Sequence, residues 1–418
     1  MRIRAHAFKR WRGSLVGAML TAWTLALPIL GAAQPVDGYV RARGVHVAQR
    51  PGATLVAVTV VIPVGSLHDP EGAPGTARFL AEIIAHSVRR RTDADPSRLD
   101  LRVERGWTAF TLLSTGDAWT RSWVALESAM FRRPLEDVAR EEVRTRLLAR
   151  FAFEEGIPAH EFQRELHRIL VGTGHPWNRD PRAMRSTIDA VDSSVLEEFR
   201  ARHYVAELAV AAVVGPVAEQ AAHEALFPVG QDARGAIVPG GDPAWTEGDR
   251  LVLEREVTNA WIGVFFPSPL DQRRTLLEFL AFQLQDELNS LPPDPGLYSA
   301  TVHIEDTPRG PVLVAQAAVV PEASGRWEER ILRAMERLGE NDDALFRWRR
   351  RRFRSASLLR EAEPEATALR MALDLVREGR ARSLPKEIPE IDAYELTDAV
   401  GSLANPRILL MGPDLPTP

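Results

Sequence analysis

The chain has 418 residues, 45% of them hydrophobic and 26% charged, which suffices for one large or two medium globular domains. Its formal net charge is −5, which argues against nucleic acid as a partner. It contains no cysteine, which excludes disulfides, thiolate metal sites and thiol nucleophiles.

The first 33 residues have the organisation of a secretory signal peptide. Five basic residues lie within the first twelve positions, an apolar stretch covers 15–30, and Gly31-Ala32-Ala33 follows it. Cleavage after Ala33 would lower the net charge from −5 to about −10. We therefore expect an exported protein of the periplasm or cell envelope of a bacterium, with an uncleaved membrane anchor as the alternative. No other run is long and apolar enough to span a bilayer.

The first half of the remaining chain alternates strand-like and helix-like patterns. A short strand is predicted over 45–49, and a strongly β-branched run predicts a second strand over 53–63. The stretch 76–88 predicts a helix, because its large apolar residues recur at helical spacing and form one stripe. The other expected elements are a strand region over 101–113, helices over 119–131, 136–153, 158–170 and 194–203, and a buried strand over 208–214.

The stretch 229–248 is rich in glycine, proline and aspartate and has no periodicity, which is typical of an interdomain linker. The domains expected on either side are 36–228 and 249–418. The second half begins again with strands. Its expected elements are strands over 251–256, 260–266, 298–304, 312–319 and 407–411, and helices over 274–288, 327–338, 345–376 and 394–403.

Both halves end with the same order of elements. A helix and an apolar strand precede Gly215-Pro216 in the first half, and the same two elements precede Gly412-Pro413 in the second. This is an internal repeat with a period of roughly 200 residues. The fold class it predicts is α+β, with sheets covered on one face by helices.

Five sequence landmarks occur in an order that is found in one known family. They are Pro51-Gly52-Ala53 to Gly65-Ser66; Asp69-Pro70-Glu71-Gly72 with Gly75-Thr76-Ala77; His175-Pro176-Trp177; Phe199 to Gly215 with His203-Tyr204; and Gly296-Leu297-Tyr298-Ser299. Together they resemble the M16 metallopeptidases of the pitrilysin, insulinase and processing-peptidase type. The resemblance implies two tandem homologous α+β domains, each a mostly antiparallel sheet covered by helices. Such domains enclose a peptide-binding chamber that a partner chain usually completes.

Active members of this family carry His-x-x-Glu-His on the first helix. Histidines at i and i+4 reach one zinc ion from the same helical face, and the glutamate activates the zinc-bound water. The matching positions here are Arg78, Ala81 and Glu82. Arg78 is a permanent cation, Ala81 has no base, and one carboxylate cannot replace the three protein ligands of a catalytic zinc. The resemblance therefore implies a member with no catalytic residue and no zinc cofactor.

The third zinc ligand of the family is a glutamate on a later helix, expected here over 136–153. The matching region contains Leu147 and Arg150 and no carboxylate. The acidic pairs at 141–142 and 154–155 flank it and are the alternatives under another alignment.

A rebuilt metal site would use Glu82 and His86, which form an i,i+4 pair. The alternative is a solvated helix face or a local hydrogen bond between the two side chains. His68 is predicted to be a polar loop residue, and His175 a structural turn residue.

In two-subunit members of the family, the chain without zinc supplies an arginine and a tyrosine that polarise the substrate carbonyl. Tyr298 occupies the tyrosine position. No arginine lies at 289–294, where the resemblance implies one, and Arg309 is a candidate substitute. A core role for Tyr298 and a solvent-exposed turn position for Arg309 are the alternatives.

The segment 347–354 contains six arginines together with Trp348 and Phe353. It is predicted to be mostly a solvated helix face. A groove for acidic peptides or a docking surface is the alternative.

The function implied by the resemblance is that of a non-catalytic subunit. It would pair with a zinc-carrying homologue as a heterodimer, or with itself, and form a chamber for binding or degrading peptides or unfolded proteins in the envelope. One alternative is a stand-alone peptide-binding or scaffold protein of the envelope. The other is an active metallopeptidase with a rebuilt metal site.

Overall fold

The computed structural model describes most of the chain after residue 43. The described ranges are 44–92, 97–154, 156–172, 175–178, 188, 191–233, 250–268, 273–340, 343–382, 388–403 and 405–415. The expected signal peptide and most of the expected linker lie outside these ranges. None of the helices within them is long and apolar enough to cross a membrane.

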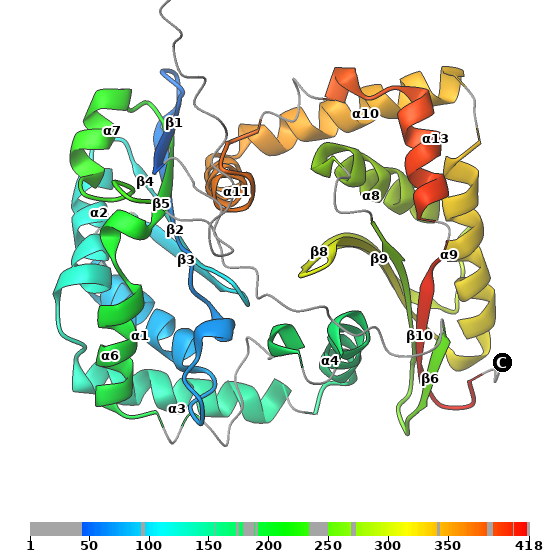
Figure 1. Cartoon of the computed structure of the whole chain (residues 1–418), viewed down its shortest axis with the longest axis horizontal. Helices are drawn as coiled ribbons and strands as arrows, with labels where there is room; N and C mark the ends of the chain where they lie inside the picture. The colour runs from blue at the N-terminus through cyan, green and yellow to red at the C-terminus, as the bar shows by residue number, and fades with distance from the viewer. Residues whose placement is uncertain are drawn as a thin grey trace, which may run out of the picture. The chain divides into compact units, whose positions relative to one another are not determined.

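The first half of the chain forms a five-stranded sheet with the order β1-β5-β2-β4-β3 (Figure 1). Its strands are β1 (Val45–Gln49), β2 (Leu55–Ile62), β3 (Arg98–Val103), β4 (Thr108–Thr115) and β5 (Val210–Gly215). β1 pairs with β5 in parallel, and the other three pairings are antiparallel. The strand region expected over 101–113 is therefore a hairpin of two strands.

The second half forms a second five-stranded sheet, with the order β6-β10-β7-β9-β8. Its strands are β6 (Arg250–Glu254), β7 (Ala260–Pro267), β8 (Leu297–Thr307), β9 (Gly310–Val319) and β10 (Arg407–Gly412). β6 pairs with β10 in parallel and the rest is antiparallel, as in the first sheet. If the strands of each sheet are numbered along the chain, both sheets have the same spatial order, first-fifth-second-fourth-third. The predicted α+β fold with two homologous, mostly antiparallel sheets is thereby confirmed.

Helices cover one face of each sheet with the stripes that the sequence predicts. In the first half these helices are α1 (Thr76–Thr92), α2 (Trp119–Glu127), α3 (Asp137–Glu154), α6 (Ser193–His203) and α7 (Glu219–Leu226). In the second half α8 (Arg274–Asn289) and α9 (Ser324–Leu338) lie on the sheet, while α10 (Asp343–Ala362) and α13 (Ala393–Ser402) pack against these helices. The helical stretch expected over 345–376 is in fact two helices, α10 and α11 (Pro364–Glu378). Proline disfavours a helical conformation in the residue before it, and Glu363 is extended.

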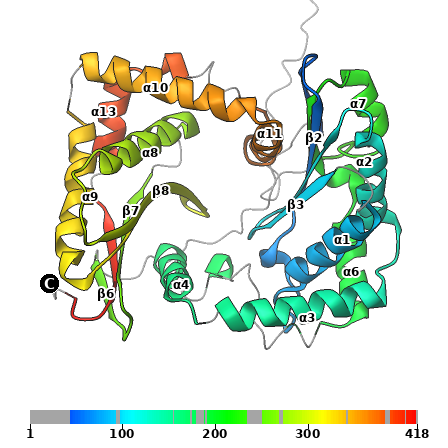
Figure 2. The same cartoon turned by 180° about the vertical axis from the view of Figure 1, so that it is seen from behind.

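The opposite face of each sheet is covered by a helix from the other half of the chain. α11 packs on β2 and β5, where its apolar side chains meet Ala57, Val61 and Val210. α4 (Pro158–Val171) packs on the second sheet, where Phe162 and Leu166 share a core with Phe265. Figure 2 shows α11 beside β2, and α4 beside β6. The expectation of one covered face per sheet was therefore incomplete, and the exchange explains why β2 is apolar on both faces.

Two histidines meet at the end of the first sheet. His68 lies in the 3₁₀ turn Ser66–His68, and its ring is 5.6 Å from the ring of His203 at the end of α6, centroid to centroid. The Gly65 N–H donates to His68 Nδ1 at 3.2 Å, so His68 is a structural turn residue here. Burial, with the charges of His68 and Arg202, lowers the pKa of His203 from 6.5 to about 4.

We expect His203 to make the fold acid-sensitive. A histidine whose pKa is lower in the folded state than in the unfolded chain takes up a proton on unfolding. Its contribution is complete above pH 6.5 and is lost as the pH falls from 6.5 towards about 4. In urea unfolding, His203→Asn should lose less stability than the wild type between about pH 7.5 and about pH 5. His223→Gln, at an exposed position on α7, serves as the control and should match the wild type. Equal losses for His203→Asn and the wild type would contradict the assignment.

Candidate functional site

The positions that match the zinc motif lie on α1, on its side towards α3. The Arg78 Nη2 atom lies 3.0 Å from Glu82 Oε1, and Arg146 Nη2 on α3 lies 3.8 Å from Glu82 Oε2. Glu82 is buried, at 8% exposure. The single carboxylate of the degenerate motif is therefore held between two permanent cations.

His86 is engaged with α3 and not with Glu82. Its Nε2 lies 2.7 Å from Glu142 Oε2, and its Nδ1 lies 3.4 Å from a guanidinium nitrogen of Arg146. Arg90 also approaches Glu142, at 3.4 Å. A donor at Nδ1 and a carboxylate at Nε2 leave no ring nitrogen of His86 free for a metal ion. The Glu82–His86 pair is therefore not arranged as a metal site.

The residues of α3 at which the third zinc ligand was expected have other contacts. Leu147 is buried in the core of the first half, and Arg150 pairs with Glu154 at 2.7 Å. The residue that faces Glu82 is Arg146, which the sequence reasoning did not single out. Its i,i+4 relation to Glu142 was a visible signal, because both then lie on the same face of the helix.

The residues at this position do not fit a catalytic zinc ion. Within the described ranges, no group of three or more histidine, aspartate and glutamate residues is arranged to hold a metal. A general base at position 81 is also missing, since Ala81 is a fully buried methyl group. What the cluster can do is tie α1 to α3 through charge-assisted hydrogen bonds.

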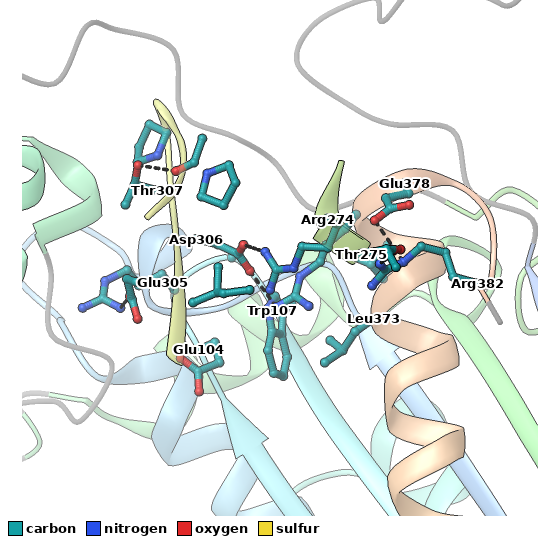
Figure 3. Close-up of a pocket in the computed structure, with 18 of the residues that line it drawn as sticks. Glu104, Trp107, Arg274, Thr275, Glu305, Asp306, Thr307, Leu373, Glu378 and Arg382 are labelled. Carbon is teal, nitrogen blue, oxygen red and sulfur yellow. Dashed lines mark hydrogen bonds and ion pairs between the residues drawn. The ribbon is translucent and has the colours of Figure 1, made fainter. Parts of the chain in front are cut away.

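A pocket of about 1070 Å³ lies between the edge strands of the two sheets and α11. Among the strands that the structure describes, β3 and β8 lie at the edges of the two sheets, and each pairs with a neighbour on one side. Figure 3 shows Glu104, Glu305 and Asp306 beside Trp107, with Arg382 and Glu378 further along. The lining of the pocket therefore combines two strand edges, an aromatic side chain, and both positively and negatively charged side chains.

A partly buried ionic cluster forms one wall of the pocket. Arg105 Nη1 and His167 Nε2 lie 3.4 and 2.9 Å from Glu305 Oε1. Burial alone would raise the pKa of Glu305, but the hydrogen bond from His167 and the nearby positive charges lower it below its usual value. Arg105 Nε also donates to the Trp177 carbonyl at 2.7 Å. This cluster joins the β3–β4 turn, α4 and β8.

Glu104 lies beside this cluster with a different environment. Burial raises the pKa of its carboxyl, and the neighbouring Glu305 acts in the same direction, against the pull of Arg105. In this pocket the negative charge of Glu305 is therefore balanced by neighbouring positive charges, whereas the carboxyl of Glu104 is shielded from water and less well balanced.

Tyr298 and Arg309 are not brought together. Tyr298 is 60% exposed near the start of β8, and Arg309 lies in the turn that follows the same strand. Nine residue steps along the strand lead from Tyr298 to Thr307, roughly 30 Å. Neither residue lines the pocket. They cannot act on one substrate carbonyl within this chain.

Comparisons with known proteins reveal similarity in structure only. No protein-family model matches the sequence, and no curated protein matches it. The fold is similar to a protease from Helicobacter pylori, with a TM-score of 0.72 and 14% identity over 90% of this chain and 99% of that one. It is similar to a peptidase M16 inactive domain from Pseudomonas fluorescens, with a TM-score of 0.71 and 13% identity over 91% and 98%. It is also similar to a chain of Complex III2 from Candida albicans, with a TM-score of 0.68 and 14% identity over 90% and 96%.

Proposed function

We propose that this chain, which has the M16 peptidase fold, is a non-catalytic subunit of the cell envelope that binds peptides together with a zinc-carrying homologue. The observation that carries the proposal is the position of Glu82 between Arg78 and Arg146. The similarity to an inactive M16 domain supports the same reading.

The charges at Glu82 oppose a divalent cation. At an effective dielectric constant of about 20, a guanidinium about 4 Å from a divalent ion repels it by roughly 8 kcal/mol. Two guanidinium groups lie within 4 Å of the only carboxylate of the motif. Zinc binding would therefore require both arginines to leave Glu82. We infer that the chain functions without zinc.

The pocket supports peptide binding as the retained activity. An extended peptide can add to an exposed strand edge through main-chain hydrogen bonds, and β3 and β8 both offer such an edge. Trp107 offers apolar contact, while Glu104 and Glu305 offer charge. These features suit a segment of peptide or unfolded protein in extended form.

A zinc-carrying partner would supply the chemistry that this chain lacks. One similar structure is a chain of a larger assembly, which supports a role as a subunit. Self-association is the alternative partner arrangement. A stand-alone peptide-binding protein is the second candidate function, favoured by a pocket that one chain completes.

The proposal is tested by purifying the chain from the native envelope with whatever remains bound. A zinc-containing M16 homologue in stoichiometric amount is expected, and peptide hydrolysis should depend on that homologue. Recovery without such a homologue, but with measurable peptide affinity, would favour the stand-alone protein. Peptide hydrolysis by this chain alone, with stoichiometric zinc, would overturn the proposal.

Removal of metal should leave the stability of this chain unchanged. Because two arginines neutralise Glu82, we expect a chelator to find no structural ion at this position. The midpoint of thermal unfolding should shift by less than about 1 °C on treatment with EDTA, measured by calorimetry. A zinc-carrying M16 peptidase treated in the same way is the positive control. A fall of about 5 °C or more would indicate a structural metal ion.

A further inference from the structure

Helix α10 has an outer face that the fold does not use. On its inner side Phe346 and Phe353 are buried, and Phe353 packs against Phe279 and Phe282 with tilted rings at 5.3 Å between ring centroids. Figure 1 shows α10 outside α8, on the side away from the second sheet. On the outer side, Trp348, Leu358 and Leu359 are 44%, 51% and 73% exposed. A single exposed apolar side chain is ordinary, but these three lie on the same face of one helix, where an apolar phase could bury them together.

Three of the six arginines at 347–354 hold the helix in place. Arg349 pairs with Glu287 at 3.3 Å, and Arg350 donates to the Ile391 carbonyl at 2.8 Å. Arg352 pairs with Asp286 and stacks on Trp348, with 4.7 Å between its guanidinium carbon and the ring centroid. The structure therefore explains these three as bonds to neighbouring elements.

The other three arginines are Arg347, Arg351 and Arg354. In the part of the chain that the structure describes, no hydrogen bond, ion pair or ring contact engages their side chains, and all three are exposed. They recur at i, i+4 and i+7, so they form one stripe along the helix. Like charges at this spacing slightly destabilise a helix. The stripe persists in a chain whose net charge is −5.

We propose that the α10 outer face, defined as Arg347, Trp348, Arg351, Arg354, Leu358 and Leu359, docks on the surface of an anionic lipid bilayer. Cations interleaved with tryptophan and leucine on one helix are the composition of interfacial helices. The cations attract anionic headgroups, while the tryptophan and leucines enter the boundary between headgroups and acyl chains.

A bilayer fits this face better than an acidic protein does. A stable protein interface buries about 800 Å² on each partner, around a shaped and closely packed centre. The α10 outer face is a single convex helix, and none of its six residues lines a described pocket. A fluid bilayer adapts to protruding side chains without a complementary shape. Charge complementarity therefore points to anionic lipid.

The absence of cysteine allows a local test. Ser355 is exposed on the same side of α10, so Ser355→Cys can carry a polarity-sensitive fluorophore. The labelled protein is purified in the form that the cell produces after any processing of its N-terminus. It is then mixed with vesicles of phosphatidylglycerol and phosphatidylcholine in about 0.1 M salt. We expect a blue shift and increased emission with these vesicles, and no change with pure phosphatidylcholine. A fluorophore at Glu219→Cys on α7 should respond to neither.

Matched variants separate this face from general electrostatic attraction. Replacing Arg347, Arg351 and Arg354 by glutamine should weaken vesicle binding about 100-fold, near fivefold for each guanidinium. Replacing Arg90, Arg202 and Arg333 by glutamine changes the net charge equally and should leave binding within about twofold of the wild type. Trp348→Ala should weaken binding about tenfold. Urea unfolding confirms that each variant is folded.

Three outcomes would overturn the proposal. One is unchanged emission at Ser355→Cys over the whole range of anionic lipid. A second is vesicle binding by the Arg347/Arg351/Arg354 variant equal to that of the wild type. The third is an emission change with polyglutamate but not with vesicles, which would assign the face to an acidic polypeptide instead.

Discussion

Arg382→Ala is expected to lower the free energy of unfolding by about 3–5 kcal/mol. The Arg382 side chain is 3% exposed, and its guanidinium lies 2.9 Å from both Asp374 Oδ1 and Glu278 Oε1. Burial disfavours the charged form, but the two carboxylates outweigh it and raise the pKa of Arg382. Without the arginine, the carboxylate of Asp374 would remain buried at 2% exposure and lose its principal counter-charge.

The size of this effect also reflects where Arg382 lies. Asp374 is on α11, which packs on the first sheet, whereas Glu278 is on α8, which packs on the second. Arg382 therefore joins elements from the two cores. Urea unfolding at neutral pH measures the loss, and Arg333→Ala, in a pair whose side chains are 62% and 59% exposed, is the matched control at below about 1 kcal/mol.

A second substitution tests the cause. Arg382→Met combined with Asp374→Leu removes both charges and should recover a large part of the loss, because the deeply buried carboxylate of Asp374 is then gone. The carboxylate of Glu278 remains, but it is partly exposed and keeps Arg274 as a partner at 3.5 Å. An Arg382→Ala variant as stable as the Arg333→Ala control would show that the network contributes little.

Rebuilding the zinc motif should create a metal site on the side of α1 that faces α3. The variant combines Arg78→His, Ala81→Glu, Glu82→His and Arg146→Glu. It restores the family spacing on α1 and places a carboxylate at the residue of α3 that faces position 82. We expect the Kd for zinc to fall from above about 1 mM to below about 1 µM, a difference of about 4 kcal/mol.

The choice of residue on α3 provides the control for this experiment. A matched variant carries Arg150→Glu in place of Arg146→Glu, because Arg150 is 52% exposed and pairs with Glu154. It has two histidines but no third ligand from α3 and should bind zinc at least tenfold more weakly. Competition with a chromophoric chelator gives the Kd for zinc of each variant, and elemental analysis gives the number of zinc ions bound. Equal affinities in the two variants would show that Arg146 does not mark the third-ligand position.

The residues at the positions of the zinc motif could be judged from the sequence because the motif is local. Residues at i, i+3 and i+4 of one helix share a face whatever surrounds the helix, so Arg78, Ala81 and Glu82 could be judged by chemistry alone. The strands were readable for a similar reason, since runs such as 55–62 are apolar except for Thr59. The break between α10 and α11 was missed although Pro364 marks it, because the apolar pattern continues across it.

The sequence by itself thus determined the α+β class and the two similar sheets, and it identified the residues that stand at the positions of the zinc motif. Only the tertiary structure decided which distant charges meet: Arg146 with Glu82, His86 with Glu142, and Arg382 with Glu278. It also decided that α4 and α11 exchange between the halves, and that Tyr298 and Arg309 lie at opposite ends of β8. The physical reason is that helix and strand periodicities depend on neighbours in sequence. Ion pairs and the second face of a sheet depend on contacts between segments far apart in the chain, which no local spacing encodes.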